Sequence, residues 1–145
     1  MKDLVLLAIA ACLAAAPAQA QDTSSGETEL GRKEYVVACA GCHGATGKGD
    51  GPIAQLIDIT TPDLTRLSAQ AGGRFPFRET LLTIDGRNDL RAHGSEMPVW
   101  GDRYMSASES VAMAQFPGMS AEVAQAITRG RLLSLVYYLD SIQQE

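Results

Sequence analysis

The sequence predicts an all-α fold. Near the C-terminus, apolar side chains recur at helical spacing, which indicates a helix with one face against a partner. These residues are Val123, Ile127, Leu135, Tyr138 and Ile142. A short helix is expected over residues 77–85, because Gly86 directly after it can adopt the left-handed conformation that ends helices. No strand-rich run flanks the paired cysteines Cys39 and Cys42.

Residues 1–20 have the pattern of a secretory signal peptide. Lys2 precedes an apolar run over residues 4–16, and a small-x-small triplet, Ala18-Gln19-Ala20, follows. The apolar run is too short to cross a bilayer. We therefore expect export, cleavage after Ala20 and no transmembrane span in the mature form. A retained membrane anchor and a lipoprotein anchor at Cys12 are the alternatives.

The rest of the chain has the length and charge of one acidic domain. Residues 21–28 are polar and are expected to be a mobile N-terminus, and residues 29–145 form the domain. The formal net charge is −5, and the leader removes one lysine and one aspartate, so the mature chain keeps this value. An acidic surface disfavours nucleic acid and anionic lipid as partners, and it favours a protein with a basic docking surface.

The segment Cys39-Ala40-Gly41-Cys42-His43 contains the residues with the clearest chemistry. Two cysteines separated by two residues and followed by a histidine are the signature of c-type haem attachment. On a helical turn this spacing puts both sulfur atoms on one face, where each can add to one vinyl group of the porphyrin. His43 can then bring its imidazole beneath the iron as an axial ligand.

Other interpretations of this motif fit the sequence less well. A thioredoxin-like redox pair belongs near a βαβ pattern, which the sequence does not show. A structural zinc site needs four ligands, and beyond Cys39, Cys42 and His43 the mature chain offers only His93 as a further histidine or cysteine. A chance occurrence of the five residues is the third alternative.

A helix is expected to start near Thr28 and to run into the motif, with Gly31 as a notch in its surface. Its apolar side would consist of Leu30, Tyr35, Val36 and Ala38. The following segment, residues 44–52, is too rich in glycine to be regular. It lacks the preceding strand and the Ser or Thr after Gly-Lys that a phosphate-binding loop requires. We expect it instead to wrap closely over one porphyrin edge, where side chains would not fit.

These segments resemble the class I cytochromes c of the bacterial periplasm, which carry a single haem. Gly31, Tyr35 and Cys39 are similar in spacing to that family's glycine, aromatic residue and first haem cysteine. Near the end, the apolar-aromatic face of its terminal helix is resembled by Leu135, Tyr138 and Leu139. The resemblance implies a cytochrome c fold, in which the N- and C-terminal helices cross and loops and short helices wrap one covalent haem c. It also implies that Tyr138 packs on Gly31 and Tyr35.

The resemblance further implies a methionine as the second axial ligand. Met97 precedes Pro98 on a turn-rich stretch, and the family presents its thioether on such a loop after the haem motif. Pro98 would keep Met97 out of a helix. One alternative is His93, which would give a haem with two histidine ligands. The others are methionines in or near helical patterns, which are more often core residues: Met105, Met113 and Met119.

Further haem contacts are expected from loop residues. In the family, a carbonyl of a proline loop accepts a hydrogen bond from the proximal histidine and fixes its ring. Pro62 resembles that proline, with Pro52 as the alternative, and Leu64 would then lie against the haem face. Trp100 is expected to contact the haem. It is also one of four candidates for holding the propionates, together with Arg74, Arg87 and Tyr104.

Residues 101–120 exceed what a minimal member of this family requires. We expect a short extra helix near 108–115, a turn at Pro117-Gly118 and a final helix from about Ala121, which Gly130 would bend or split. The insertion would be either a docking surface for a partner or a cover for one haem edge.

The expected function is single-electron transfer rather than catalysis. With His43 and Met97 on the iron, no coordination position is open to a substrate, and the soft thioether favours the ferrous state. The expected partners are redox proteins, with a dehydrogenase or cytochrome complex as donor and an oxidase or reductase as acceptor. The alternatives are a haem c subunit of a periplasmic dehydrogenase or oxidase complex, a peroxidase-like enzyme that uses His93, and a sensor in which a gas displaces Met97.

Overall fold

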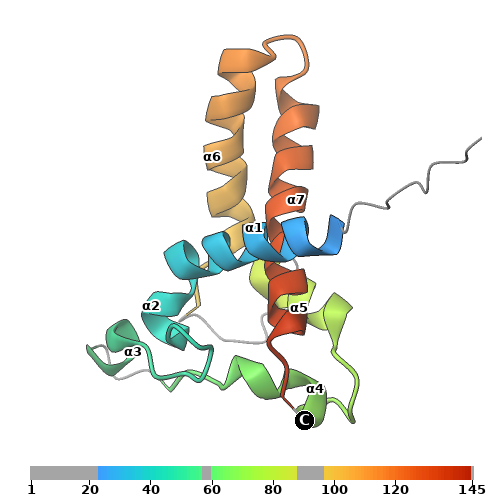
Figure 1. Ribbon diagram of the computed structural model, residues 1–145. Coiled ribbons are helices and arrows are strands. Elements are labelled where there is room, and N and C mark those ends of the chain that lie inside the picture. The colour runs from blue at the N-terminus through green and yellow to red at the C-terminus, as the bar shows by residue number, and fades with distance from the viewer. Residues whose placement is uncertain (1–22, 57–59, 88–96, 145) are drawn as a thin grey trace, which may run out of the picture.

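The computed structural model describes residues 23–56, 60–87 and 97–144, which form helices and loops and contain no strand (Figure 1). The all-α prediction is confirmed. The elements are α1 (Thr23–Ala38), α2 (Ala40–His43), α3 (Pro52–Leu56), η1 (Leu64–Arg66), α4 (Leu67–Gln70), α5 (Phe77–Asp85), α6 (Trp100–Gln115) and α7 (Ser120–Ser141). No helix within these ranges is long and apolar enough to cross a membrane. The predicted signal peptide and His93 lie outside them.

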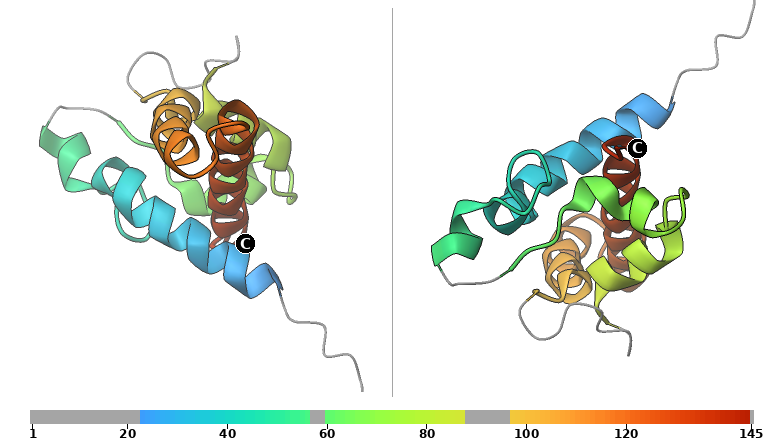
Figure 2. Two further views of the ribbon diagram at one scale, coloured as in Figure 1. Left: turned by 90° about the horizontal axis from the view of Figure 1, so that it is seen from above. Right: turned by 90° about the horizontal axis from the view of Figure 1, so that it is seen from below.

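Helices α1 and α7 cross at a steep angle, and Figure 2 shows the crossing from both ends of α7. The two backbones can come close because Gly31 has no side chain. A Cβ atom there would overlap the carbonyl oxygen of Ser134 and lie 2.8 Å from the Cβ of Tyr138. One turn further along α1, the ring of Tyr35 packs against that of Tyr138, with 5.1 Å between the ring centroids. The predicted contact of Tyr138 with Gly31 and Tyr35 is therefore confirmed.

Helix α1 differs from the prediction in its start and in its apolar face. It begins at Thr23 rather than near Thr28, so residues 23–28, predicted to be mobile, continue the helix. Leu30 and Val36 are 47% and 55% exposed instead of forming its buried side. Leu30 and Val36 directly neighbour Gly31 and Tyr35 in the chain, and because successive residues of a helix point about 100° apart, their side chains do not face α7.

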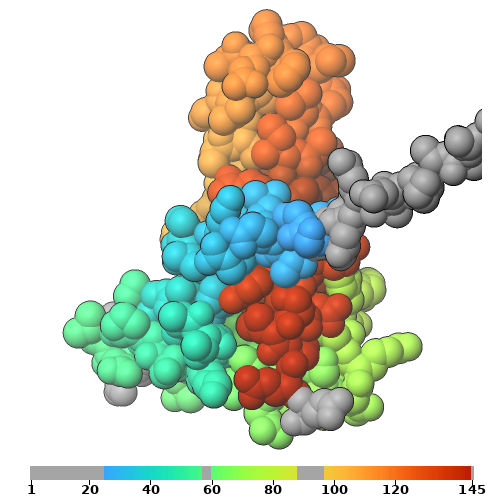
Figure 3. Space-filling model, viewed as in Figure 1, coloured from blue at the N-terminus to red at the C-terminus, as the bar shows by residue number. Residues whose placement is uncertain are grey.

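Helix α6 and the first half of α7 form an antiparallel hairpin that projects away from the rest of the molecule (Figures 1 and 3). Small side chains line its interface: Ala112 and Ala124 are both fully buried. A buried hydrogen bond of 3.2 Å from the Thr128 hydroxyl to the Ser108 hydroxyl joins the two helices. Around these residues the two helices thus approach closely through small side chains.

The predicted turn and the predicted start of the final helix near Ala121 are confirmed, but the extra helix is longer than predicted. The turn at Pro117-Gly118 is present, but α6 begins at Trp100, well before the expected start near residue 108. Its buried residues Tyr104, Ser108 and Ala112 lie four positions apart and face α7, whose packing stabilises a helix of low apolar content. Helix α7 runs unbroken through Gly130, which is exposed and has no neighbouring atom to push against it.

The predicted helix over residues 77–85 is confirmed as α5, and Gly86 ends it in the left-handed conformation with φ of 65°. The start of α6 lies against this end of α5. A Cβ atom at Gly101 would overlap the side chains of Asp85 and Arg87. These contacts hold the end of α5 beside the start of α6, and so position the residues around Met97 that lead into α6.

Candidate functional site

The Cys39–His43 motif lies at the junction of α1 and α2. The Cys39 N–H donates to the Tyr35 carbonyl (2.8 Å) and the His43 N–H donates to the Cys39 carbonyl (2.9 Å), so helical hydrogen bonding continues through the motif. Cys39 and His43 are 8% and 7% exposed, Cys42 is half-buried, and both cysteines are free thiols. The turn therefore brings two sulfur atoms and a buried imidazole together.

Burial raises the pKa of the Cys39 thiol to about 12, and the negative charge of Glu34 adds to the effect. At neutral pH Cys39 is a protonated thiol, whereas redox-active cysteines depend on a lowered pKa. This counts against the thioredoxin-like interpretation. In the described ranges, no three side chains of the types His, Cys, Asp and Glu converge as a metal site. The zinc interpretation therefore has no ligand set there.

The glycine-rich segment 44–51 folds back onto the motif. The Gly49 N–H donates to the His43 carbonyl at 2.9 Å, and the buried Tyr35 hydroxyl donates to the Gly44 carbonyl at 2.7 Å. The loop thus uses backbone groups to hold the motif in place. This arrangement agrees with a loop that wraps the haem motif rather than one that binds phosphate.

Two hydrogen bonds dock the predicted proline loop on this region. The Thr61 hydroxyl lies 3.2 Å from the Cys42 carbonyl, and the Leu64 N–H donates to the Gly47 carbonyl at 2.7 Å. Pro62 lies between these two anchors and is exposed. A hydrogen bond from the proximal histidine to the Pro62 carbonyl stays a prediction.

Four predicted site residues meet at one apolar cluster, which we call the core cluster. Its buried members are Tyr35, Cys39, Leu64, Ile84, Tyr104, Leu132, Leu135, Val136 and Leu139. Met97 and Trp100 are half-buried and pack against it. The fold thus brings the first haem cysteine, Leu64, Met97 and Trp100 from three separate segments to a common apolar region.

The alternative methionines lie elsewhere. Met113 and Met119 are 68% and 60% exposed near the turn of the hairpin. The Met105 sulfur lies 3.9 Å from the Thr128 hydroxyl, inside the hairpin interface. Among the methionines of the described residues, Met97 alone packs on the core cluster.

The candidates for the propionates separate into two groups. Tyr104 is buried in the core cluster, and Trp100 packs beside it with 5.7 Å between their ring centroids. Arg74 is exposed in the turn before α5, and Arg87 is ion-paired with Asp85 at the surface. Only the two aromatic residues therefore lie at the core cluster.

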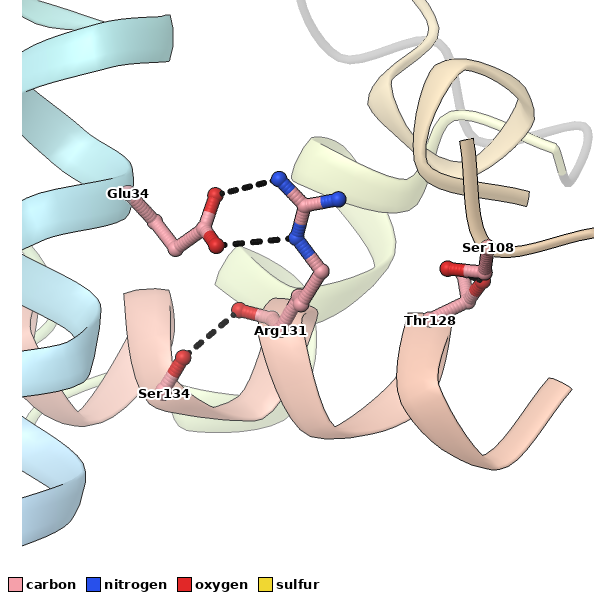
Figure 4. Close-up of polar contacts among 5 residues, drawn as sticks. All are labelled: Glu34, Ser108, Thr128, Arg131 and Ser134. Carbon is pink, nitrogen blue, oxygen red and sulfur yellow. Dashed lines mark hydrogen bonds and ion pairs between the residues drawn. The ribbon is translucent and has the colours of Figure 1, made fainter. Parts of the chain in front are cut away.

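A charged group that the sequence did not predict lies between α1, α6 and α7. Arg131 donates two hydrogen bonds to the Glu34 carboxylate, at 2.8 and 2.9 Å (Figure 4). Its guanidinium carbon lies 4.1 Å from the centre of the Tyr104 ring. Burial and the nearby Glu34 carboxylate raise the pKa of Tyr104, whose buried hydroxyl has no partner in hydrogen-bond geometry among the described residues. No local signal marks such a pair, because its two charged residues are 97 positions apart.

A comparison with models of known families decides the family. The model of the Cytochrome c family matches residues 28–141, which is most of the chain. This chain belongs to the cytochrome c family. Neither curated proteins nor solved structures give a match to this cytochrome c. Membership implies a covalently bound haem c and electron transfer, and the crossed terminal helices agree with the fold of the family.

The residues present fit a covalent haem in this cytochrome c. Two free thiols on one helical turn are the groups that form thioethers with the vinyl substituents, and a buried histidine follows them. A thioether side chain, Met97, packs on the apolar region shared with Cys39. Tyr104, buried in the core cluster, adds a polar hydroxyl to this region.

Proposed function

We propose that this cytochrome c is a single-electron carrier of the periplasm with one haem c. Cys39 and Cys42 would hold the haem covalently, and His43 and Met97 would be the protein ligands of its iron. The observation that carries the proposal is the packing of Met97 on the same apolar cluster as Cys39, from a distant part of the chain.

The ligand set determines the chemistry. When bound, the haem supplies an iron centre that changes between the ferrous and ferric states by one electron. Met97 is a soft ligand that favours the ferrous state, so it raises the reduction potential relative to a second histidine. With both His43 and Met97 bound to the iron, no coordination position would be open to a substrate. Electron transfer therefore fits this site better than catalysis.

The surrounding side chains exclude water and order the ligands. Leu64 and Tyr104 are 7% and 4% exposed, and in this proposal Leu64 and Trp100 contact the haem. The Pro62 carbonyl accepts a hydrogen bond from His43, which fixes the imidazole ring and raises its basicity. Apolar surroundings also disfavour the more highly charged ferric state, which raises the potential further.

The partners in this proposal are redox proteins on the outer side of the cytoplasmic membrane. The donor is a dehydrogenase or cytochrome complex, and the acceptor is an oxidase or reductase. The net charge of −5 favours partners with basic docking surfaces. The intact mass of the exported protein tests the leader and the cofactor together, because it must equal residues 21–145 plus one haem.

Optical spectra of the exported protein in both redox states test the axial ligands. We expect the weak ferric band of a thioether ligand, and slow binding of CO by the ferrous protein. Met97→Ala should abolish the band and permit rapid CO binding. Met113→Ala is the matched control, because Met113 is exposed at the far end of α6 and should change neither signal. Rapid CO binding by the wild type at neutral pH would contradict the carrier proposal.

The hairpin supports a second candidate, a haem c subunit of a periplasmic dehydrogenase or oxidase complex. Around its turn, Met113, Phe116 and Met119 are 68%, 44% and 60% exposed, and exposed apolar groups of this kind mark interaction surfaces. Sedimentation of the protein in a fresh periplasmic extract separates the candidates. Sedimentation as a single chain supports the carrier, and a larger assembly that Phe116→Ser dissociates supports the subunit.

A further inference from the structure

Three helices meet at a charged group, which we call the Arg131 cluster: Glu34 of α1, Tyr104 of α6 and Arg131 of α7. Arg131 binds the Glu34 carboxylate through two parallel hydrogen bonds of 2.8 and 2.9 Å (Figure 4). This fork geometry is specific for arginine and fixes orientation as well as distance. The same guanidinium lies over the Tyr104 ring, 4.1 Å from its centre. One planar group thus connects α7 to both α1 and α6.

The cluster is sheltered from solvent. The side chains of Arg131 and Glu34 are 30% and 14% exposed, and the Tyr104 residue is 4% exposed. By contrast, the side chains of the Arg32–Glu29 pair on the outer face of α1 are 50% and 47% exposed. Sheltered pairs are screened less by salt and hold their geometry better than exposed ones. The Arg131 cluster can therefore set the position of α6.

Tyr104 connects the cluster to the segment that contains Met97. The Tyr104 ring packs against Trp100, with 5.7 Å between centroids, and Trp100 is the first residue of α6. Met97, Pro98 and Val99 lead directly into Trp100. A displacement of Tyr104 therefore moves the start of α6, and with it the methionine.

Glu34 connects the cluster to the cysteine motif. It lies on the last turns of α1, five residues before Cys39, in the helix that leads into the motif. Cys39 and Tyr104 are members of the same buried cluster. Arg131 thus bridges the element that ends in the haem cysteines and the element that begins after Met97.

We propose that Arg131 is a positioning residue for the distal ligand: by holding Tyr104 and Glu34 together, it keeps Met97 at the distance from the Cys39–His43 motif at which the thioether stays on the iron. This inference rests on the proposed function, in which Met97 is an axial ligand. It assigns no contact between Arg131 and the haem.

The test uses the haem-loaded protein and the variant Arg131→Gln, which keeps length and polarity but loses the charge and the fork. Two measurements are made where the helical circular dichroism is native: the rate of CO binding to the ferrous protein and the strength of the ferric thioether band. We expect the rate of CO binding to rise about tenfold, which corresponds to a loss of ~1.4 kcal/mol in the free energy that keeps the thioether on the iron. We also expect the ferric thioether band to weaken. Arg131→Lys should restore part of both signals, because lysine keeps the charge without the planar fork.

Arg129→Gln is the matched control, since Arg129 is exposed on the same helix, and we expect wild-type values for it. If Arg131→Gln is not soluble, Glu34→Gln decides, because it keeps the packing and removes the anchor of Arg131. A change in the same direction supports the inference, and wild-type values contradict it. A second outcome would also overturn the inference. If the thioether band and the helical circular dichroism of Arg131→Gln disappear at the same denaturant concentration, Arg131 stabilises the fold as a whole and does not position Met97 in particular. A wild type without the band contradicts the proposed function itself.

Discussion

The carbonyl oxygen of Ser134 occupies the space that a side chain at Gly31 would need. Gly31→Ala must therefore push α1 and α7 apart, and we expect a loss of about 1–3 kcal/mol in the free energy of unfolding, the usual cost of overpacking. Denaturant unfolding followed by circular dichroism measures it. Two glycines in the same helices are controls, since a Cβ at Gly26 or Gly130 meets no atom within 4 Å. Alanine there should stabilise by up to about 1 kcal/mol through helix propensity.

The hydrogen bond between Thr128 and Ser108 should contribute to the stability of the hairpin. Both residues are buried, at 0% and 1% exposed. Thr128→Val leaves the Ser108 hydroxyl without this partner and should cost about 1–3 kcal/mol of stability. The double variant Thr128→Val with Ser108→Ala removes both hydroxyl groups and should lose less than the single variant. Equal losses in the two variants would show that the cost comes from packing and not from the unsatisfied hydroxyl.

Asp63 should give the protein a pH-dependent term in stability. Its carboxylate accepts hydrogen bonds from the Thr65 hydroxyl at 2.6 Å and the Thr65 N–H at 2.9 Å, and these bonds lower the pKa of Asp63. Because the pKa is lowered in the folded state, the carboxylate stabilises the fold fully above the usual aspartate pKa of about 4. This stabilisation is lost as the pH falls through the pKa of the folded state. Asp63→Ala should cost about 1 kcal/mol at pH 7, as for the loss of a helix cap.

The pH series supplies the check on this prediction. In urea unfolding, the difference between Asp63→Ala and the wild type should shrink below pH ~4. Asp63→Asn is the control, because its amide oxygen can still accept a hydrogen bond but does not titrate in this range. A difference that stays constant from pH 7 to acid would exclude the carboxylate as its source.

Removal of both haem cysteines should release the cofactor. In Cys39→Ser with Cys42→Ser no sulfur remains to form a thioether, so acidified organic solvent should extract all haem, whereas the wild type should keep its haem on the polypeptide. Haem staining of a denaturing gel measures this. Cys12→Ser is the control, since Cys12 lies in the predicted leader and should not affect attachment. Haem that stays bound without both cysteines would contradict covalent attachment through this motif.

The terminal crossing could be predicted because Gly31, Tyr35 and Tyr138 resemble, in residue type and spacing, the positions at which the two terminal helices of the cytochrome c family meet. Gly31 and Tyr35 lie four positions apart on α1, and Tyr138 recurs with the apolar residues of α7. Helix α5 could be predicted for a similar reason, since Gly86 marks its end. In each case a local pattern and a steric need coincide.

Other features depend on partners far along the chain. Glu34 and Arg131 are 97 positions apart, and neither has a neighbour in sequence that indicates the pair. The early start of α6 was missed because Gly101, Ser108 and Ala112 are small or polar and give little apolar periodicity. Their burial depends on α7, which tertiary packing places beside them.

The separation between contacting residues also bears on the order in which the chain folds. The hairpin bond joins residues 20 positions apart, whereas the bond from α7 to α1 joins residues 97 positions apart. Short loops close at a smaller cost in entropy, so we expect α6 and α7 to pair before α1 docks. Pulsed hydrogen exchange during refolding should then protect α6 amides before α1 amides.

During synthesis, the cysteine motif emerges long before α7. The motif is therefore open to modification while the helix that will cover α1 has not yet arrived. If α1 docks last, as we expect, the crossing of α1 and α7 forms after the motif has become accessible, and haem attachment can precede the packing that buries Cys39.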